Sequence, residues 1–255
     1  MFKKIIHAVF LYDNKRKAVT LLLVFAFIGC IKNQDRLFSQ EAICVESTNA
    51  VKKVAFLTFD DGPSNMTEEI LDTLKEEEVN ASFFMIGELI TEDKEPLLRR
   101  MVEEGNLIGI HTYTHRVKEI YASADAYIED ARKTADRIYE VTGTEPTYYR
   151  FPWGSSNCFI SPFCDEIIVC MENDGYTYFD WNVSAEDSVG KPSQQKIIAN
   201  IRKDYKKYKE PVILLHDSSI NKNTAKALRY IIDELKAEGY EFATIDKRSK
   251  PCQFK

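Results

Sequence analysis

From Lys53 onward, strand-like runs alternate with helical patterns, which strongly limits the possible folds. Apolar, β-branched or aromatic runs occupy residues 53–59, 81–86, 107–110, 147–151, 177–183, 211–216 and 241–245. Amphipathic helical patterns occupy residues 65–78, 92–104, 123–142, 162–174, 192–208 and 223–238. Left-handed C-caps are expected at Gly105, Gly143, Gly175 and Gly239. Seven strands alternating with helices, without a linker between them, predict one α/β domain with a parallel sheet.

Polar residues after several of these strands favour a barrel over an open sheet. Asp60 and Asp61, His111, Arg150 and His216 fall at the C-terminal ends of four different predicted strands. In a barrel all such ends meet on one face, where active sites form. A doubly wound sheet gathers ligands mainly at its switch point. We therefore expect a barrel of about seven parallel strands with helices outside.

Residues 1–31 are predicted to be a signal peptide or a membrane anchor. Five basic residues precede the uncharged stretch Ala18–Ile31. This stretch is short for a spanning helix, which needs roughly twenty apolar residues. Phe27-Ile28-Gly29-Cys30 resembles a bacterial lipoprotein cleavage box, so a cleaved signal, a lipidated one and an uncleaved anchor all stay open. We expect an exported protein, extracellular or attached to the outer face of the bacterial cytoplasmic membrane, with a linker over 32–51 and a domain over 52–255.

The charge of the exported part makes a nucleic-acid partner unexpected. Residues 1–29 carry five of the 34 basic and one of the 40 acidic residues, which leaves 29 against 39 and a net charge of −10. A nucleic-acid surface would be basic. The sequence sets no oligomeric state, and a monomer is expected.

The cysteines predict disulfides rather than a structural zinc site. The chain has no C-x2-C pair, and export permits disulfide formation. Cys44 and Cys252 bracket the domain, so we expect them to pair, and we expect one bridge among Cys158, Cys164 and Cys170. Free buried thiols are the alternative.

Carboxylates and imidazoles at strand ends indicate a metal site. Asp60-Asp61 follows one apolar run, and His111 and His115 stand four apart after another. One carboxylate beside two imidazoles is a common zinc ligand set that leaves room for water and substrate. Asp-Asp-Gly-Pro could instead be a surface turn, and His-x3-His could be one face of a helix. Their combination favours a mononuclear metal hydrolase.

Two further residues complete the predicted site. Arg150 begins the segment Arg150-Phe151-Pro152-Trp153-Gly154, and its guanidinium could hold a nearby carboxylate ionised. His216 ends the apolar run 211–216. The alternatives are a surface arginine before a proline turn and a hydrogen-bonded histidine at the rim.

Together these motifs resemble the polysaccharide deacetylases with a NodB homology domain, carbohydrate esterase family 4, over about residues 53–245. The resemblance rests on residues 58–64, on His111-Thr112-x-x-His115, on residues 150–154 and on Leu214-x-His216. It implies a distorted (β/α) barrel that binds one divalent ion, usually zinc. It also implies removal of acetyl groups from sugar N-acetyl or O-acetyl groups.

Residue roles follow from the same resemblance, position by position. Asp61, His111 and His115 would be the metal ligands and Asp60 the general base. Arg150 would hold that base, and His216 would be the general acid. Substrate would lie against Pro152, Trp153 and Leu214, with Leu214 lining the pocket for the acetyl methyl and a backbone N–H near Trp153 stabilising the oxyanion.

One motif departs from the family pattern, in the segment from Trp181 to Ser188. Ser184 stands where an aspartate that tunes the acid histidine is expected, and Ser188 replaces a tryptophan, while Asp187 remains. Either another group supports His216, or the pKa of His216 and the pocket wall differ from those of typical members.

The expected function is metal-dependent deacetylation of an N-acetylated glycan. Peptidoglycan is the default substrate of an exported bacterial domain of this kind, while chitin, xylan and a biofilm polysaccharide stay open. A carbohydrate-binding protein without activity is one alternative. A hydrolase of small amides or ureides is another, which export disfavours.

Overall fold

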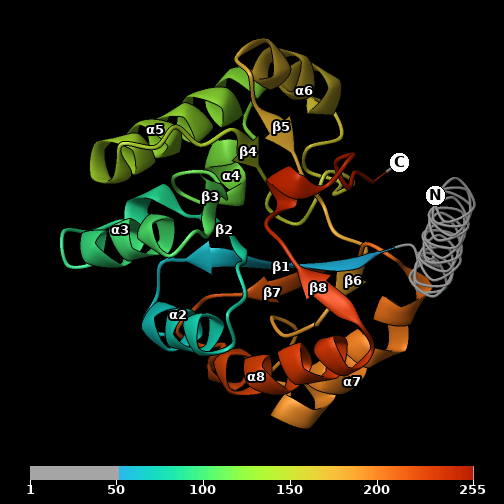
Figure 1. Cartoon of the computed structure of the whole chain (residues 1–255). Helices are drawn as coiled ribbons and strands as arrows, with labels where there is room; N and C mark the ends of the chain where they lie inside the picture. The colour runs from blue at the N-terminus through green and yellow to red at the C-terminus, as the bar shows by residue number, and fades with distance from the viewer. Residues whose placement is uncertain (1–51, 255) are drawn as a thin grey trace, which may run out of the picture. The chain divides into compact units, whose positions relative to one another are not determined.

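The computed structural model describes residues 52–254, and it contains the predicted parallel sheet. The paired strands run in the order β5-β4-β3-β2-β1-β7-β6, and β8 pairs with the start of β1 (Figure 1). Every one of these pairs is parallel. The strands are β1 (Lys53–Gly62), β2 (Ser82–Met85), β3 (Leu107–Ile110), β4 (Tyr148–Tyr149), β5 (Thr177–Tyr178), β6 (Val183–Ser184), β7 (Val212–His216) and β8 (Tyr240–Phe242).

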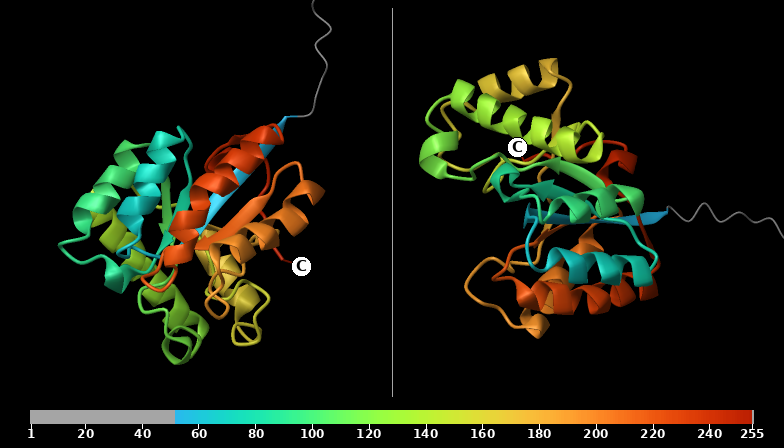
Figure 2. Two further views of the ribbon diagram at one scale, coloured as in Figure 1. Left: turned by 90° about the horizontal axis from the view of Figure 1, so that it is seen from below. Right: turned by 90° about the vertical axis from the view of Figure 1, so that its left-hand side faces the viewer.

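Helices lie outside the curled sheet, as Figures 1 and 2 show. They are α2 (Thr67–Glu76), α3 (Glu95–Glu103), α4 (Val117–Ile120), α5 (Ala124–Thr142), α6 (Cys164–Asn173), α7 (Gln194–Asp204) and α8 (Lys222–Ala237), with short 3₁₀ turns η1 (Gly87–Leu89), η2 (Tyr205–Lys207) and η3 (Ile245–Lys247). The predicted helix 192–208 ends earlier, since its last turn is the 3₁₀ turn η2. The short α4 was not predicted.

The barrel is open between β5 and β6, the two ends of the paired-strand order. A single strand was predicted over 177–183, but the chain leaves the sheet between Tyr178 and Val183. The carbonyl groups of Phe179 and Asp180 accept hydrogen bonds from the Arg150 guanidinium rather than from a neighbouring strand. The result is an incomplete, distorted (β/α) barrel, which confirms the predicted fold class.

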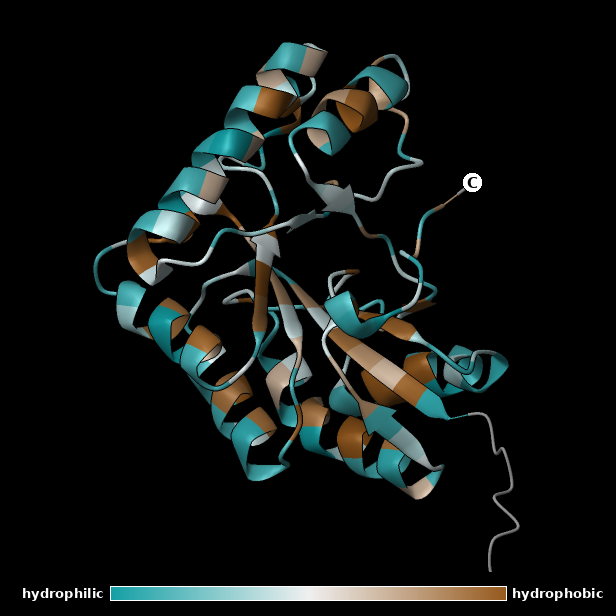
Figure 3. Ribbon diagram, turned by 45° about the horizontal axis from the view of Figure 1, so that its top comes forward, coloured by the Kyte–Doolittle hydropathy of each residue, from teal (hydrophilic) through white to brown (hydrophobic). Residues whose placement is uncertain are grey.

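The core lies between the sheet and the surrounding helices. Residues 55–60 of β1 are all buried, and Phe59 stacks on Phe83 of β2 with ring centroids 5.1 Å apart. Such continuous burial is typical of a parallel strand covered on both faces. Figure 3 shows the corresponding hydrophobic residues along the central strands. Burying one such aromatic side chain contributes about 1.5–3 kcal/mol to folding.

Helix α5 shows how the sequence sets one outer helix. The Ser123 hydroxyl accepts a hydrogen bond from the Ala126 N–H and caps its N-terminus. Its core face is the predicted one, with Ala124, Ile128, Ala131, Ala135 and Ile138 buried. Gly143 ends the helix at φ 69°, in the left-handed conformation that was expected there.

Some predictions concern residues outside the described range. They are the predictions of a leader over 1–31, of a linker over 32–51 and of a lipidated Cys30. The predicted Cys44–Cys252 pair also includes one such residue, Cys44. Among residues 52–254, no helix is both long and apolar enough to cross a membrane.

The predicted bridge among Cys158, Cys164 and Cys170 is wrong, because all three are free thiols. Cys164 and Cys170 both belong to α6. Six residues of helix separate them by about 9 Å along the axis. That spacing exceeds the reach of a disulfide, whose Cα atoms lie within roughly 7 Å.

Candidate active site

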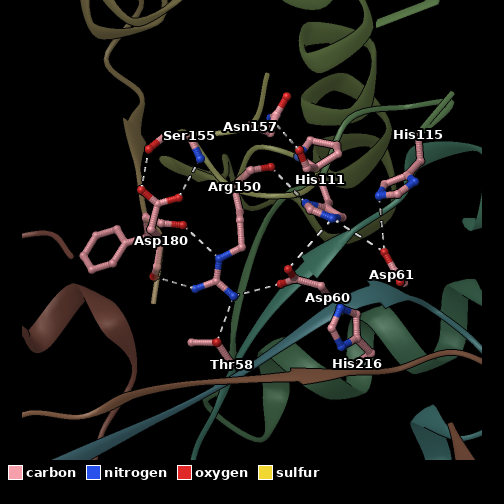
Figure 4. Close-up of polar contacts among 12 residues, drawn as sticks. Thr58, Asp60, Asp61, His111, His115, Arg150, Ser155, Asn157, Asp180 and His216 are labelled. Carbon is pink, nitrogen blue, oxygen red and sulfur yellow. Dashed lines mark hydrogen bonds and ion pairs between the residues drawn. The ribbon is translucent and has the colours of Figure 1, made fainter. Parts of the chain in front are cut away.

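The predicted site residues meet on one face of the barrel, at the C-terminal ends of the strands (Figure 4). Asp60 and Asp61 lie at the end of β1, and His216 is the last residue of β7. His111 and Arg150 directly follow β3 and β4. They surround or adjoin a cavity of about 410 Å³, which is lined by Asp60, Asp61, His111, His115, Trp153, Trp181, Ser184, Glu186, Ser188, Val189, Leu214 and His216.

Asp61, His111 and His115 bring three possible metal ligands together. One ligand atom from each lies within 4.8 Å of the others. The Asp61 Oδ1 atom is 3.5 Å from the Nε2 atom of each imidazole. One carboxylate and two imidazoles around an open cavity suit a divalent ion such as zinc.

The environment of His111 orients its ring for ligation. Its Nδ1 lies 2.9 Å from the Arg150 carbonyl oxygen, which can only accept, so Nδ1 carries the proton. Nε2 is therefore the free nitrogen, and it faces Asp61. Burial, together with the nearby His115, lowers the pKa of His111 to about 3, so its ring is neutral. A neutral histidine whose second nitrogen donates to a carbonyl is the usual form of a metal ligand.

A backbone irregularity lets both adjacent carboxylates face the cavity. In a regular strand, neighbouring side chains point to opposite faces. Here the register between β1 and β2 shifts between Asp60 and Gly62, and Asp61 adopts a left-handed conformation with φ 70°. His115 and Trp153 also have positive φ, at 52° and 64°. Such conformations cost about 1–3 kcal/mol each and cluster at functional sites.

Arg150 holds Asp60 in place through an ion pair. Its side chain is fully buried, and its Nη1 donates to Asp60 Oδ1 at 2.9 Å and to Thr58 Oγ1 at 2.8 Å. Its Nε and Nη2 donate to the carbonyl oxygens of Phe179 and Asp180. Burial raises the pKa of Asp60, although the positive charge of Arg150 opposes this shift. Asp60 is therefore more basic than an exposed carboxylate.

Asp187 holds His216 on another side of the cavity. Its Oδ1 lies 2.8 Å from His216 Nδ1, and its Oδ2 accepts from the His216 backbone N–H and from Thr224 Oγ1. Burial alone would lower the pKa of His216, but the hydrogen bond and charge of Asp187 raise this pKa to about 9. His216 is thus a protonated imidazolium at neutral pH.

This contact decides between the two alternatives left open by Ser184, because another group does support His216. An aspartate was expected at that position, and its absence left the support of His216 open. Asp187, three residues later, supplies that support. Glu186, with φ 50°, turns the loop just before it.

The structure places two of the three predicted substrate-binding residues in the cavity wall. Leu214 and Trp153 line the cavity, and the half-exposed Trp153 ring lies 4.8 Å from the His115 ring. Pro152 is not among the lining residues. Its carbonyl oxygen accepts from Tyr121 Oη at 2.9 Å and Asn157 Nδ2 at 3.1 Å, which anchors the loop that carries Trp153.

Two buried aspartates near the site, Asp217 and Asp180, were not predicted from the sequence. Asp217 accepts hydrogen bonds from Ser64 Oγ and Thr67 Oγ1, and its N–H donates to the Asp60 carbonyl oxygen. A Cβ on Gly62 would lie 2.6 Å from Asp217 Oδ2, so the turn after Asp61 requires glycine. The only sequence signal for Asp217 was its place beside His216.

The second missed aspartate is Asp180. Its carboxylate accepts from Ser155 N–H and Oγ at 2.9 and 2.6 Å and from the Phe254 N–H at 2.8 Å. The only sequence signal for it was its place before Trp181.

Comparisons with known proteins agree with this geometry. The family model described as polysaccharide deacetylase matches residues 47–178. The chain is 30% identical over 207 residues to a peptidoglycan-N-acetylglucosamine deacetylase of Bacillus cereus, covering 78% of this chain and 71% of that protein. It resembles the catalytic domain of peptidoglycan N-acetylglucosamine deacetylase from Eubacterium rectale, with a TM-score of 0.72, 30% identity, and coverage of 84% and 98%. The polysaccharide deacetylase Bc1974 from Bacillus cereus gives a TM-score of 0.72, 30% identity, and coverage of 80% and 97%.

Proposed function

Since the chain belongs to the polysaccharide deacetylase family, we propose that it removes acetyl groups from the N-acetylated sugars of peptidoglycan, with the help of one zinc ion. The reaction class, hydrolysis of an amide bond between an acetyl group and a sugar, follows from the family itself. The observation that carries the proposal is that Asp61, His111 and His115 lie close together. Beside them lie two groups that can transfer protons, Asp60 and His216, each held in place by a buried charged partner. The names of the relatives support peptidoglycan as the glycan.

Asp61, His111 and His115 would hold the ion. When bound there, it supplies Lewis acidity, which polarises an acetyl carbonyl group and makes a water molecule more acidic. The carbonyl group of Arg150 fixes the His111 ring, so the protein sets the direction of the ligand nitrogen before the ion arrives.

Asp60 is the proposed general base. Arg150 donates a hydrogen bond to Asp60 Oδ1. Asp60 Oδ2 lies 3.8 Å from His111 Nε2, beside the proposed metal ligands. Oδ2 is therefore placed to take a proton from a water molecule that attacks the acetyl carbon. The guanidinium stabilises the ionised carboxylate before the transfer, and the raised pKa of Asp60 favours proton acceptance.

His216 is the proposed general acid. Asp187 binds its Nδ1, which leaves Nε2 as the ring nitrogen available to substrate. An amine leaves poorly unless it is protonated, so a proton from Nε2 to the sugar nitrogen completes C–N cleavage. With a pKa of about 9, His216 carries that proton at neutral pH.

The cavity walls suit a sugar that bears an acetyl group. Leu214, nearly fully buried, offers an apolar contact for the acetyl methyl. Trp153 offers an aromatic face for the sugar ring, and a backbone N–H near it is the proposed oxyanion donor. We further propose that the protein is exported, extracellular or attached to the outer face of the cytoplasmic membrane, because a cell-wall glycan lies there.

The proposal is tested by acetate release from a panel of N-acetylated peptidoglycan, chito-oligomers and acetylated xylan. Wild type is expected to release acetate from peptidoglycan. Asp60→Asn should lose nearly all release, whereas the matched control Asp93→Asn, at an exposed aspartate, should keep it. No release from any of these glycans would refute the deacetylase proposal. Release from xylan alone would refute peptidoglycan as the substrate.

A further inference from the structure

The C-terminal segment Cys252–Phe254 lies against the chain at the opening between β5 and β6. The Cys252 carbonyl oxygen accepts a hydrogen bond from the Asp180 N–H at 2.7 Å. Phe254 N–H donates to Asp180 Oδ2 at 2.8 Å, and Gln253 Nε2 donates to the Tyr178 carbonyl oxygen at 3.3 Å. Figure 1 shows this red segment passing β5. Because β5 and β6 do not pair with each other, these bonds satisfy polar groups that a closed barrel would pair between strands.

The Phe254 ring lies between two parts of the cavity wall. Its centroid is 4.9 Å from the Trp181 ring, at an interplanar angle of 80°. A Cβ on Gly154 would lie 2.8 Å from Phe254 Cε2, so the ring also packs directly on the backbone beside Trp153. Trp153 and Trp181 both line the cavity, and they are the only tryptophans in the chain. Phe254 thus packs against Trp181 and against the segment that carries Trp153.

Asp180 ties the same parts together by hydrogen bonds. Its buried carboxylate binds Ser155 and Phe254, and its carbonyl oxygen accepts from Arg150 Nη2 at 3.0 Å. Ser155 follows the Trp153-Gly154 turn. A single buried residue therefore connects the C-terminal segment, the loop that carries Trp153 and the arginine that holds Asp60. Neither Asp180 nor Phe254 lines the cavity itself.

We propose that Phe254 and Asp180 are positioning residues that hold Trp153 and Trp181 in place to bind the glycan. The C-terminal segment Cys252–Phe254 then supports the glycan-binding site from behind its wall, without lining the cavity. This rests on the proposed function for its catalytic readout, while the placement of the two tryptophans can be measured without substrate.

The kinetic test compares Phe254→Ala, the conservative variant Phe254→Tyr and the control Tyr139→Ala, which removes an exposed aromatic ring from α5. The energy of an edge-to-face aromatic pair corresponds to about a twofold to twelvefold change in an equilibrium constant. Phe254→Ala should raise KM for acetylated peptidoglycan by that factor and change kcat by less than about twofold. Phe254→Tyr and Tyr139→Ala should match wild type. An unchanged KM in Phe254→Ala would overturn the proposal, and so would a loss in Phe254→Tyr equal to that in Phe254→Ala.

The second test uses tryptophan fluorescence, because both tryptophans lie in the cavity wall. Acrylamide should quench Phe254→Ala and Asp180→Asn more strongly than wild type, and the number of zinc ions bound per chain should not change. Equal quenching in wild type and both variants would overturn the proposal. If wild type releases no acetate from any glycan, the proposed function fails. The quenching result still decides whether Phe254 and Asp180 hold the two tryptophans of the cavity wall in place.

Discussion

Replacing Asp187 by asparagine should remove most of the basicity of His216. The Asp187 carboxylate accepts from both the ring Nδ1 and the backbone N–H of His216, each at 2.8 Å. Burial of the ring lowers the pKa of His216, but the hydrogen bond and charge of Asp187, with smaller contributions from Asp60 and Asp61, raise it from 6.5 to about 9. At 1.36 kcal/mol for each pKa unit, this shift corresponds to about 3 kcal/mol in favour of the protonated form. In Asp187→Asn the two largest raising causes are lost while burial stays, so the pKa should fall from about 9 towards 6.5.

The raised pKa of His216 also makes the free energy of unfolding fall as pH rises. The folded protein holds the His216 proton up to a pKa of about 9, whereas the unfolded chain releases it near 6.5. The stabilisation of about 3 kcal/mol is therefore complete below pH 6.5 and lost as pH rises through about 9. Wild type should lose that much free energy of unfolding between pH 6 and 10 relative to Asp187→Asn.

Nuclear magnetic resonance of ¹⁵N-labelled histidine, in the presence of a chelator, measures the pKa directly. Urea denaturation at pH 6 and pH 10 measures the stability. Thr224→Val is the matched control, because it removes one hydrogen bond from the Asp187 carboxylate but keeps its charge. Its His216 should keep a raised pKa. A wild-type pKa near or below 6.5, or an Asp187→Asn pKa still near 9, would refute the role given to Asp187.

Three other substitutions test separate parts of the structure. Arg150→Lys should cost about 3–5 kcal/mol in urea denaturation, because a lysine cannot reproduce four hydrogen bonds of a buried guanidinium, and a cost below about 1 kcal/mol would contradict this. His216→Ala should keep bound zinc but lose about 10²- to 10⁴-fold in acetate release, whereas loss of zinc would identify it as a ligand instead. Gly109→Ala should cost about 1–3 kcal/mol, because its Cβ would lie 2.8 Å from the Tyr148 carbonyl oxygen, and a neutral effect would contradict the close spacing of β3 and β4.

The parallel sheet and the meeting of the site residues could be predicted because they depend on local patterns. Buried parallel strands give continuous apolar runs, such as residues 54–57, and amphipathic helices separate them. Parallel order then places all strand ends on one face. Asp61, His111 and His216 were therefore expected together although they are far apart in the sequence, and the structure brings them together.

The opening between β5 and β6 could not be predicted from the local sequence. The strand-like run 177–183, rich in aromatic and β-branched residues, looks the same whether its carbonyl groups bind a strand or the Arg150 side chain. Asp217 and Ser64 form a buried hydrogen bond across 153 positions of sequence, and no local pattern encodes that contact. Asp187 could not be assigned as the support of His216 for a related reason, since its position depends on a loop in which the preceding Glu186 is left-handed.

The most direct test of a metal-dependent deacetylase is acetate release from N-acetylated peptidoglycan before chelation, after chelation and after zinc is restored. Asp61, His111 and His115 form the one cluster of possible ligands found in residues 52–254, which predicts one functional ion per chain. Release should stop when the metal is removed and return when one equivalent of zinc is added. His111→Ala should show no return at that concentration. Full release from the metal-free protein would contradict the account.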